Sequence, residues 1–489
     1  MISADPRSMY TVTIGIECHV QLKTKTKLFS GADNDAREAA PNTLVNHIDF
    51  GLPGALPVLN EKAVELASKA AFALNSQPQT FSKFDRKHYF YPDLPMGYQI
   101  TQFDEPIILG GHVDIVLDGT SKKIGITRAH LEADAGKSTH PAGSDYSLVD
   151  LNRAGTPLLE IVSEPDMHSA AEAKAYAHEL YLLMRYAEVS EANLYYGNMR
   201  FDVNVSVSKT GELGTRTETK NLNSFKSIEK AVEFEVNRQI ELLEKGEAIV
   251  QETRGWDDDK QATFSQRTKE DAHDYRYMPD PDLPPVLLDD TYVSTIQNSM
   301  PLLPNDYRQK FATMGLDPAV IEDIIAVPQT AHMVARIFDT AGPEHARRIA
   351  FWVMQPANDD TENQNADEST DEKVQSQVNY DTQLIALSHM VAENKLSSTA
   401  AKEVLAEVLK TGADPQKVAE AKNLLQESDE GAIAEIVAAV LASNAKAAED
   451  VKNGEMKAIG FLVGQVMKQS AGKANPALAT KLIKEQLGV

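Results

Sequence analysis

Four segments of the chain alternate between apolar and polar residues, which is the pattern of a strand with one buried face. They lie at 10–22, 128–135, around residue 160 and at 199–208. The polar faces carry, in chain order, Glu17 and His19, then Arg128, His130, Glu132 and Asp134, then Glu160, and finally Arg200 and Asp202. Such alternation belongs to antiparallel sheets with one solvated face. Four strands with acidic residues on that face predict a concave site.

Helical spacing of apolar residues predicts three helices in the same part of the chain, at 61–74, 170–187 and 225–245. Ser169 is the expected N-cap of the second. After residue 301 only helical patterns remain, at 306–314, 318–325, 331–339 and 344–354, and again from about 381.

We therefore predict an α+β protein with three domains. They are an N-terminal antiparallel-sheet cradle domain at 1–297, an all-α helical domain at 298–412 and a small helical tail domain at 413–489. A stretch within the helical domain, at about 357–380, is acidic and poor in large apolar residues, which predicts a disordered insertion. The last 38 residues, 452–489, hold six lysines against two glutamates. This fits either an RNA contact or an ordinary solvated lysine-rich helix.

Charge and composition narrow the class of protein. The 489 residues include 72 acidic and 48 basic ones, for a net charge of −24, which argues against broad electrostatic binding of nucleic acid but not against a local basic patch. No apolar run approaches the ~20 residues of a membrane span, and the first residues do not resemble a signal peptide, so we expect a cytoplasmic protein without membrane contact. Cys18 is the single cysteine and shares the apolar face of 10–22, so it is a poor nucleophile candidate.

The segment 130–137 concentrates candidate chemistry, because metal-capable side chains and a lysine follow one another there. A solvated sheet face with a salt-bridging lysine is the alternative. A phosphate loop is excluded, since Leu131 stands where that motif needs a glycine. The loop 84–101 mixes cations and aromatics and fits either an anionic or aromatic ligand or a packed surface loop. Lys220 precedes the helix 225–245 and is placed to meet an anion near its N-terminus.

Seven motifs give the chain a family resemblance. They are IGIECHV (14–20), GLPG (51–54), HLEADAGK (130–137), NRAGTPL (152–158), KNLNS (220–224), HDYRY (273–277) and GFLVGQVMK (460–468). In this order they resemble the B subunits of aspartyl/glutamyl-tRNA amidotransferases, over nearly the whole chain. The resemblance implies a cradle, a helical domain and a tail of the YqeY type.

The resemblance also implies an activity. In that family ATP phosphorylates the side-chain carboxylate of glutamate misacylated on tRNA-Gln, or of aspartate on tRNA-Asn, and ammonia then displaces the phosphate. It places a magnesium site on Glu17, His19 and Glu132, to which we add Glu160 and Asp202 because they lie on polar strand faces. We expect Glu17, His19, Glu132 and Lys220 to be catalytic, and Lys137, Arg153, Lys220 and Arg276 to contact phosphate or carboxylate groups.

The expected partners follow from the same resemblance, because this chain has no plausible glutaminase of its own. Ammonia is then expected from a glutaminase chain, the family's A subunit, with the small C subunit lying between the two. The helical and tail domains are expected to bind misacylated tRNA. Many relatives carry zinc-binding cysteines where Ser30, Ala32, Asn46 and Asp49 stand here, so we expect ATP and Mg²⁺ but no zinc. Many also have a second glutamate where Ala133 stands.

Two other function classes compete with this interpretation. One is a non-catalytic tRNA-binding scaffold of the same complex, and the other is a free-standing metal-dependent hydrolase. The acidic strand faces weigh against the scaffold, and the missing nucleophile weighs against the hydrolase.

Overall fold

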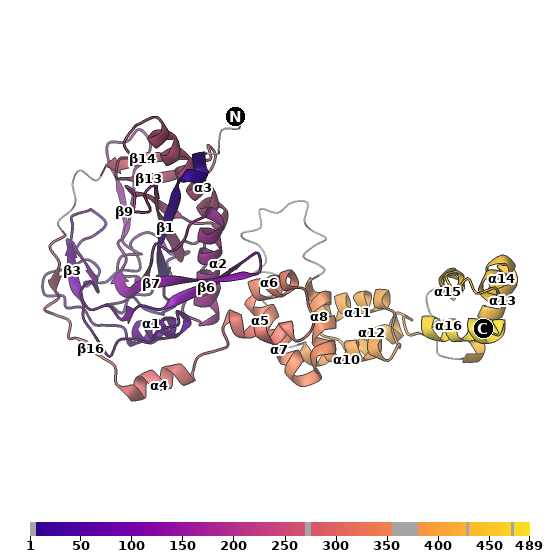
Figure 1. Ribbon diagram of the computed structural model, residues 1–489. Helices are drawn as coiled ribbons and strands as arrows, with labels where there is room; N and C mark the ends of the chain where they lie inside the picture. Colours follow the sequence, from indigo (N-terminus) through magenta and orange to yellow (C-terminus); the bar gives the residue numbers. More distant parts are fainter. Residues whose placement is uncertain (1–5, 269–274, 355–379, 427–429, 471–473) are drawn as a thin grey trace. The chain divides into compact units, whose positions relative to one another are not determined.

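The computed structural model describes residues 6–268, 275–354, 380–426, 430–470 and 474–489, and the chain divides into two units, Met1–Pro304 and Asn305–Val489 (Figure 1). The first unit is mixed α and β, and the described part of the second is helical. The α+β class is therefore confirmed. The division at 297 and 412 stays a prediction, and the predicted insertion at 357–380 lies outside the described residues except for Tyr380.

A sheet of twelve strands forms the first unit. Its main path runs β14 (Ala262–Thr268), β13 (Glu252–Asp257), β12 (Thr217–Leu222), β11 (Met199–Ser208), β1 (Thr11–Gln21), β10 (Pro157–Ser163), β7 (Thr120–Ala133), β4 (Tyr98–Thr101), β3 (Asp85–His88) and β15 (Met278–Pro279). β5 (Ile108–Leu109) and β6 (His112–Leu117) pair with β7 off this path. Two short pairs lie apart from it, β16 (Val286–Leu287) with β2 (Phe81–Ser82), and β8 (Lys137–Thr139) with β9 (Leu148–Asp150).

The four strands predicted from alternation are neighbours in the sheet, in the order β11, β1, β10 and β7. The prediction of a purely antiparallel sheet is wrong at one pair, since β12 and β13 run parallel. The helix α3 (Phe225–Glu244) connects these two strands, and a crossover of that kind returns the chain in the same direction. The predicted strand 128–135 is also wrong at both ends, because β7 begins at Thr120 and stops at Ala133. Asp134 still exchanges backbone hydrogen bonds with Thr156 and Gly155, but Gly155 has a φ of +85° and turns the neighbouring chain, so the regular ladder ends there.

The apolar face of the sheet packs on helices. Val12, Ile14, Ile16, Cys18 and Val20 alternate along β1 and are buried in the same core as residues of α2 (Ala170–Tyr186) and α3. A serine side chain caps the N-terminus of each helix. Ser169, the predicted cap of α2, accepts a hydrogen bond from the backbone amide of Glu172, and Ser224 caps α3 by accepting one from the backbone amide of Ser227. In Figure 1 the two helices lie together along one face of the sheet, which leaves the opposite, polar face for the site. The remaining helical elements of this unit are η1 (Pro6–Met9), α1 (Glu61–Ala73) and α4 (Asp290–Asn298).

The second unit contains helices only, in the part of it that the structure describes. They are α5 (Pro304–Ala312), α6 (Pro318–Ala326), α7 (Pro328–Ala341), α8 (Pro343–Met354), α10 (Asp381–Ala392), α11 (Ser398–Thr411), α12 (Pro415–Ala421), α13 (Glu430–Ser443), α14 (Ala445–Lys452), α15 (Ala458–Gln469) and α16 (Pro476–Leu487). Many begin with proline, whose fixed φ suits a first helical turn. The last four share a core that includes Val437, Leu462, Val466 and Ile483.

No single helix within the described ranges is both long and apolar enough to cross a membrane, and only the bent pair Gly431–Ser443 and Ala445–Lys452 meets that test in combination.

Candidate active site

The polar faces of four neighbouring strands bring the predicted acids together. Pairing across the strands sets His19 of β1 opposite Glu160 of β10, and Glu160 opposite His130 of β7. On its other side, β1 sets Glu17 opposite Asp202 of β11. Residues far apart in the sequence therefore meet because the strand order makes them neighbours.

The first group, which we call the histidine–carboxylate cluster, consists of His19, Glu132 and Glu160. Nε2 of His19 lies 3.5 Å from Oε2 of Glu160 and 3.7 Å from Oε1 of Glu132. One ligand atom from each of the three residues lies within 4.8 Å of the others, which is a spacing that a single cation can bridge. Two carboxylates and an imidazole fit a divalent ion that completes its shell with water or phosphate oxygens.

Burial and the close approach of several charged groups shift the pKa values of the residues in this cluster. Burial alone lowers the pKa of His19, but the carboxylates of Glu160, Glu132 and Asp202 outweigh it and raise that pKa to about 9. Burial and the neighbouring Glu160 raise the pKa of Glu132 to about 7. Burial also opposes ionisation of Glu160, yet the nearby histidines and Lys87 hold the pKa of Glu160 well below its usual range. Two carboxylates this close favour a bound cation.

His130 lies against the same cluster, with Nε2 3.5 Å from Oε2 of Glu160. Burial lowers the pKa of His130 to about 4, so its imidazole is neutral at pH 7. Nδ1 of His130 is buried and has no hydrogen-bond partner among the described residues.

The second group, the lysine–carboxylate cluster, consists of Glu17, Asp202, Glu218 and Lys220. The Lys220 ammonium lies 2.8 Å from Oδ2 of Asp202 and 3.0 Å from Oε1 of Glu218. Burial, followed by the charges of Glu160 and Glu218, raises the pKa of Glu17. Glu17, Asp202 and Glu218 also offer ligand atoms within 4.8 Å of one another. In this structure Lys220 pairs with Asp202 and Glu218, and its predicted contact with a substrate anion stays a prediction.

The expectation that the polar face is solvated is wrong for its central residues. His130, Glu132 and Asp202 are only 3–4% exposed. Side chains of the loop after β3 and of the segment before β15 lie beside them. The Lys87 ammonium lies 4.9 Å from the ring centre of Tyr275 and 6.0 Å from that of Tyr89.

Of the other three predicted phosphate contacts, Arg153 and Lys137 line one cavity, and Arg276 is not among the residues that line it. Arg153 is held in position, with Nε 3.2 Å from Oδ2 of Asp134, a carboxylate that Arg200 also contacts at 3.1 Å. Lys137 is exposed at the start of β8 and lines the same cavity as Arg153. The Arg276 side chain is exposed, and its backbone carbonyl lies 2.9 Å from Nδ1 of His88. Motif residues 273 and 274 lie outside the described residues.

Two functional candidates were missed from the sequence. Lys87 is half-buried beside the histidine–carboxylate cluster; burial lowers its pKa, but the charges of Glu132 and Glu160 raise it overall. The cation-rich loop 84–101 was the available signal. Glu218 of β12 completes the second cluster, but its neighbours Thr217 and Thr219 are polar and buried, so β12 shows no alternation.

Comparison with known protein families assigns this sheet, with its two clusters, to a class of protein. Residues 12–294 match the family described as the GatB/GatE catalytic domain, and residues 340–487 match the family described as the GatB domain. Three relatives, each named as the B subunit of an aspartyl/glutamyl-tRNA(Asn/Gln) amidotransferase, are similar along almost their whole length. The protein of Desulfotalea psychrophila is 45% identical over 98% of this chain and 99% of its own. That of Caldicellulosiruptor bescii is 43% identical and that of Alkalilimnicola ehrlichii 46% identical, each with the same coverage.

The chain therefore belongs to the family of aspartyl/glutamyl-tRNA(Asn/Gln) amidotransferase B subunits, and the resemblance stated from the motifs is confirmed.

Proposed function

We propose that this chain carries out the ATP-dependent step of tRNA-dependent amidation. Its substrate is the side-chain carboxylate of glutamate on tRNA-Gln, of aspartate on tRNA-Asn, or of both. One observation carries the proposal: His19, Glu132 and Glu160 gather ligand atoms within 4.8 Å on neighbouring strands, and Lys87 stands beside them. Phosphoryl transfer needs such a group of cation ligands next to fixed positive charge.

The histidine–carboxylate cluster is the proposed Mg²⁺ site, and Glu17 and Asp202 of the second cluster are the further predicted ligands. A Mg²⁺ ion held there would neutralise the charge that builds up during phosphoryl transfer. Lys87 contributes a fixed ammonium whose charge is retained because Glu132 and Glu160 raise its pKa. His130 stays neutral and packs behind the carboxylates, where it orients Glu160 without adding charge.

The chemistry has two steps. A side-chain carboxylate oxygen of the misacylated amino acid attacks the γ-phosphorus of ATP, the bond to the β-phosphate oxygen breaks, and ADP leaves. Ammonia then attacks the acyl carbon, phosphate leaves, and a proton is lost to give the amide. The chain's residues bind the anions, orient the carboxylate and hold the charge that develops during transfer.

Ammonia comes from outside this chain in this proposal. Cys18 is fully buried in the core and burial raises the pKa of its thiol well above the usual value, so it is unsuited to attack glutamine. The proposed source is a glutaminase partner, the A subunit, while the small C subunit makes the complex a heterotrimer. The relatives' designation as B subunits supports a complex of several chains. Binding of tRNA by the helical unit and a cytoplasmic location belong to the same proposal.

The test is ATP-dependent phosphate release by the reconstituted complex supplied with misacylated tRNA. Glu132→Gln is expected to lose release while keeping tRNA affinity, because it removes a cation ligand and not a tRNA contact. Glu164→Gln, just beyond the end of β10, is the matched control and keeps both. If Glu132→Gln retains full release, the chemistry belongs to another chain of the complex and this one is a tRNA-binding scaffold.

A further inference from the structure

A β-bulge in the middle of β7 changes which side chains of that strand face the core. Ile126 is buried in the core, but three positions farther along it is Ala129 that is buried there. The register against β10 shifts at this point, so Thr127 has no opposite residue in β10. The bulge places Arg128 on the polar face next to His130, whereas a regular strand would turn it toward the core with Ile126. Bulges are common beside active sites, where they re-aim a side chain in this way.

The guanidinium of Arg128 has donors that the described residues do not use. Its Nε is buried and has no hydrogen-bond partner among them, and no ion pair joins it to a carboxylate in that part of the chain. Arg153 and Arg200, by contrast, both bind Asp134. Because buried donors in proteins are nearly always hydrogen-bonded, a donor of Arg128 left without a partner indicates a position for a ligand or a water molecule.

Aromatic rings hold this arginine in place. Cζ of Arg128 lies 5.8 Å from the ring centre of Phe103. Phe103 in turn stacks on Tyr277, with ring centres 3.8 Å apart at 12°, and its backbone amide donates to Oδ2 of Asp85 at 3.1 Å. Contact with an aromatic ring fixes a guanidinium without using its N–H donors. The donors of Arg128 are therefore both positioned and unused.

The arginine and its aromatic support lie beside the histidine–carboxylate cluster. Burial is the main cause that lowers the pKa of His130 to about 4; Glu160 opposes this, and the charge of Arg128 adds to it. Burial also raises the pKa of Tyr277, and the charges of Glu160 and Glu132 contribute to that shift. Charges act in this way only over short distances inside a protein. Arg128 is thus a neighbour of the cluster that pairs with neither of its carboxylates.

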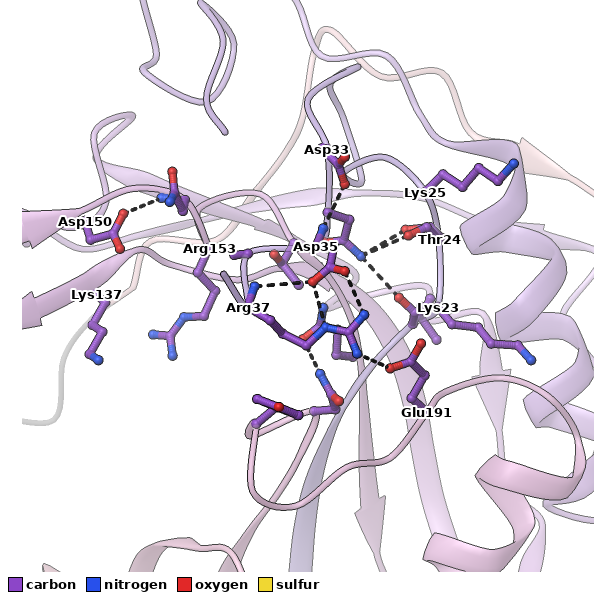
Figure 2. Close-up of a pocket in the computed structure, with 18 of the residues that line it drawn as sticks. Lys23, Thr24, Lys25, Asp33, Asp35, Arg37, Lys137, Asp150, Arg153 and Glu191 are labelled. Atoms are coloured by element: carbon purple, nitrogen blue, oxygen red, sulfur yellow. Dashed lines mark hydrogen bonds and ion pairs between the residues drawn. The ribbon is translucent and has the colours of Figure 1, made fainter. Parts of the chain in front are cut away.

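The other cations near the cluster lie elsewhere. A cavity of about 880 Å³ lies past Asp134, and its wall includes the cations that Figure 2 labels as Lys23, Lys25, Lys137 and Arg153. Arg128 stands six positions before Asp134, about 20 Å away along an extended chain, and is not among the residues that line this cavity. Lys87 reaches the cluster from β3. The cluster therefore has an ammonium from β3 and a guanidinium from β7 as separate neighbours.

We infer that Arg128 is a further catalytic residue, whose guanidinium binds the phosphoryl group that passes from ATP to the side-chain carboxylate. The inference rests on the proposed function and names a residue to which that function gives no role. As the bond from the carboxylate oxygen to phosphorus forms and the bond to ADP breaks, negative charge spreads over the three equatorial oxygens. A fork of N–H donors fits two such oxygens, and Arg128 stays protonated throughout. The same donors then hold the phosphate that leaves when ammonia attacks the acyl carbon.

The first experiment measures nucleotide binding by the reconstituted complex in the presence of Mg²⁺, with ADP and with the non-hydrolysable ATP analogue AMP-PNP. Arg128→Ala should weaken binding of AMP-PNP by about 10- to 100-fold and leave that of ADP unchanged, because only the analogue carries a γ-phosphoryl group. Arg216→Ala is the matched control, since Arg216 is exposed before β12 and has no ion pair among the described residues. It should bind both nucleotides like wild type.

The substrate carboxylate is the other anion that such a fork can bind, and the same variants separate the two. If Arg128→Ala binds AMP-PNP like wild type but has a raised KM for misacylated tRNA, the arginine holds the carboxylate and the inference is overturned. If neither quantity changes, Arg128 has no part in the reaction and the inference is likewise overturned.

The second experiment separates a catalytic role of Arg128 from a structural one. Phosphate release by Arg128→Ala should fall by about 10³-fold or more in kcat. Millimolar guanidinium should restore part of it, and sodium chloride at the same ionic strength should not. Arg128→Lys keeps the charge but loses the fork, so it should recover only a fraction of the activity. A lowered Tm together with no rescue by guanidinium would assign Arg128 to the fold and overturn the inference.

Glu132→Gln keeps this inference distinct from the function on which it rests. Full phosphate release by Glu132→Gln would refute the proposed function itself. Normal release by Arg128→Ala, beside an inactive Glu132→Gln, would refute the role of Arg128 alone.

Discussion

His19 and Glu160 face each other across neighbouring strands, with Nε2 of His19 3.5 Å from Oε2 of Glu160. This contact is the strongest reason that the pKa of His19 is about 9 in spite of its burial. Such a histidine keeps its proton near neutral pH until a cation displaces it.

Replacing Glu160 with glutamine should lower the pKa of His19 from about 9 toward or below its ordinary 6.5. The amide removes both a hydrogen bond and a negative charge, while the cost of burial remains. NMR titration of ¹³C-labelled histidines measures this directly, with the His19 resonance assigned from the His19→Asn variant. Glu164→Gln, outside the cluster, should leave the titration unchanged. An unchanged His19 pKa in Glu160→Gln would contradict the assignment of Glu160 as its main partner.

The alternation of apolar and polar residues predicted the strands from the sequence. It did not predict the burial that arises from contacts between residues far apart in the chain. The strand β11 has the predicted bounds, and β1 differs from the predicted 10–22 by one residue at each end. Both strands could be predicted because the two-residue alternation depends only on neighbouring residues. Burial of Glu132 is not local. It depends on residues such as Lys87 and Tyr277, which lie near Glu132 but belong to chain segments far from β7 in the sequence.

The candidate site was likewise predicted only in part. Glu17, His19, Glu132, Glu160 and Asp202 were placed on polar faces correctly, but the strand order separates them into two clusters. Nothing in the alternation fixes that order. Of the cavity lysines, Lys137 was named from the sequence, but Lys23 and Lys25 were missed, since they follow the end of β1 in a turn without a repeating pattern.

Lys220→Met should destabilise the fold by about 1–2 kcal/mol, an amount reduced by the partial exposure of the side chain. The lysine is 36% exposed and contacts Asp202 and Glu218, which lose their neutralising partner in the variant. Urea denaturation measures the change. Millimolar Mg²⁺ should recover more stability in the variant than in wild type, because Glu17, Asp202 and Glu218 are then free to bind a cation.

The control for Lys220→Met is Lys226→Met at the start of α3, where the lysine is exposed and no ion pair is present among the described residues. That variant should unfold like wild type with or without Mg²⁺. Equal stabilisation of both variants by Mg²⁺ would refute the expected cation binding at the second cluster.

Glu235→Gln should cost about 3 kcal/mol at pH 7, because a fully buried carboxylate loses its charge between two arginines. Its oxygens lie 2.8 Å from Nη2 of Arg238 and 2.9 Å from Nε of Arg254. Burial opposes ionisation, but Arg238, Thr263 and Arg254 lower the pKa of Glu235. A lowered folded-state pKa stabilises the fold above the ordinary glutamate value of about 4.3, and this stabilisation is lost as pH falls through the folded value.

The difference between wild type and Glu235→Gln should therefore be constant from pH 7 to about 5 and shrink below about 4.3. Urea midpoints across that range measure it. Glu229→Gln, on the same helix with its side chain 38% exposed and in a surface ion pair with Lys174, is the matched control and should change little at any pH. A difference that grows on acidification would contradict the assigned direction of the pKa shift.

Lys27→Met should destabilise the protein by about 3 kcal/mol, since it leaves a buried carboxylate without its cation. The Lys27 ammonium is 0% exposed and lies 3.3 Å from Oδ2 of Asp49, whose other oxygen accepts from Ser30 at 2.9 Å. We expect no zinc at Ser30 and Asp49, and we predict that the Lys27–Asp49 ion pair cross-links this loop. Lys27→Met/Asp49→Asn should recover most of the loss, and a chelator should leave Tm of wild type unchanged. A double variant as unstable as the sum of the single ones, or a chelator-sensitive Tm, would refute this cross-link.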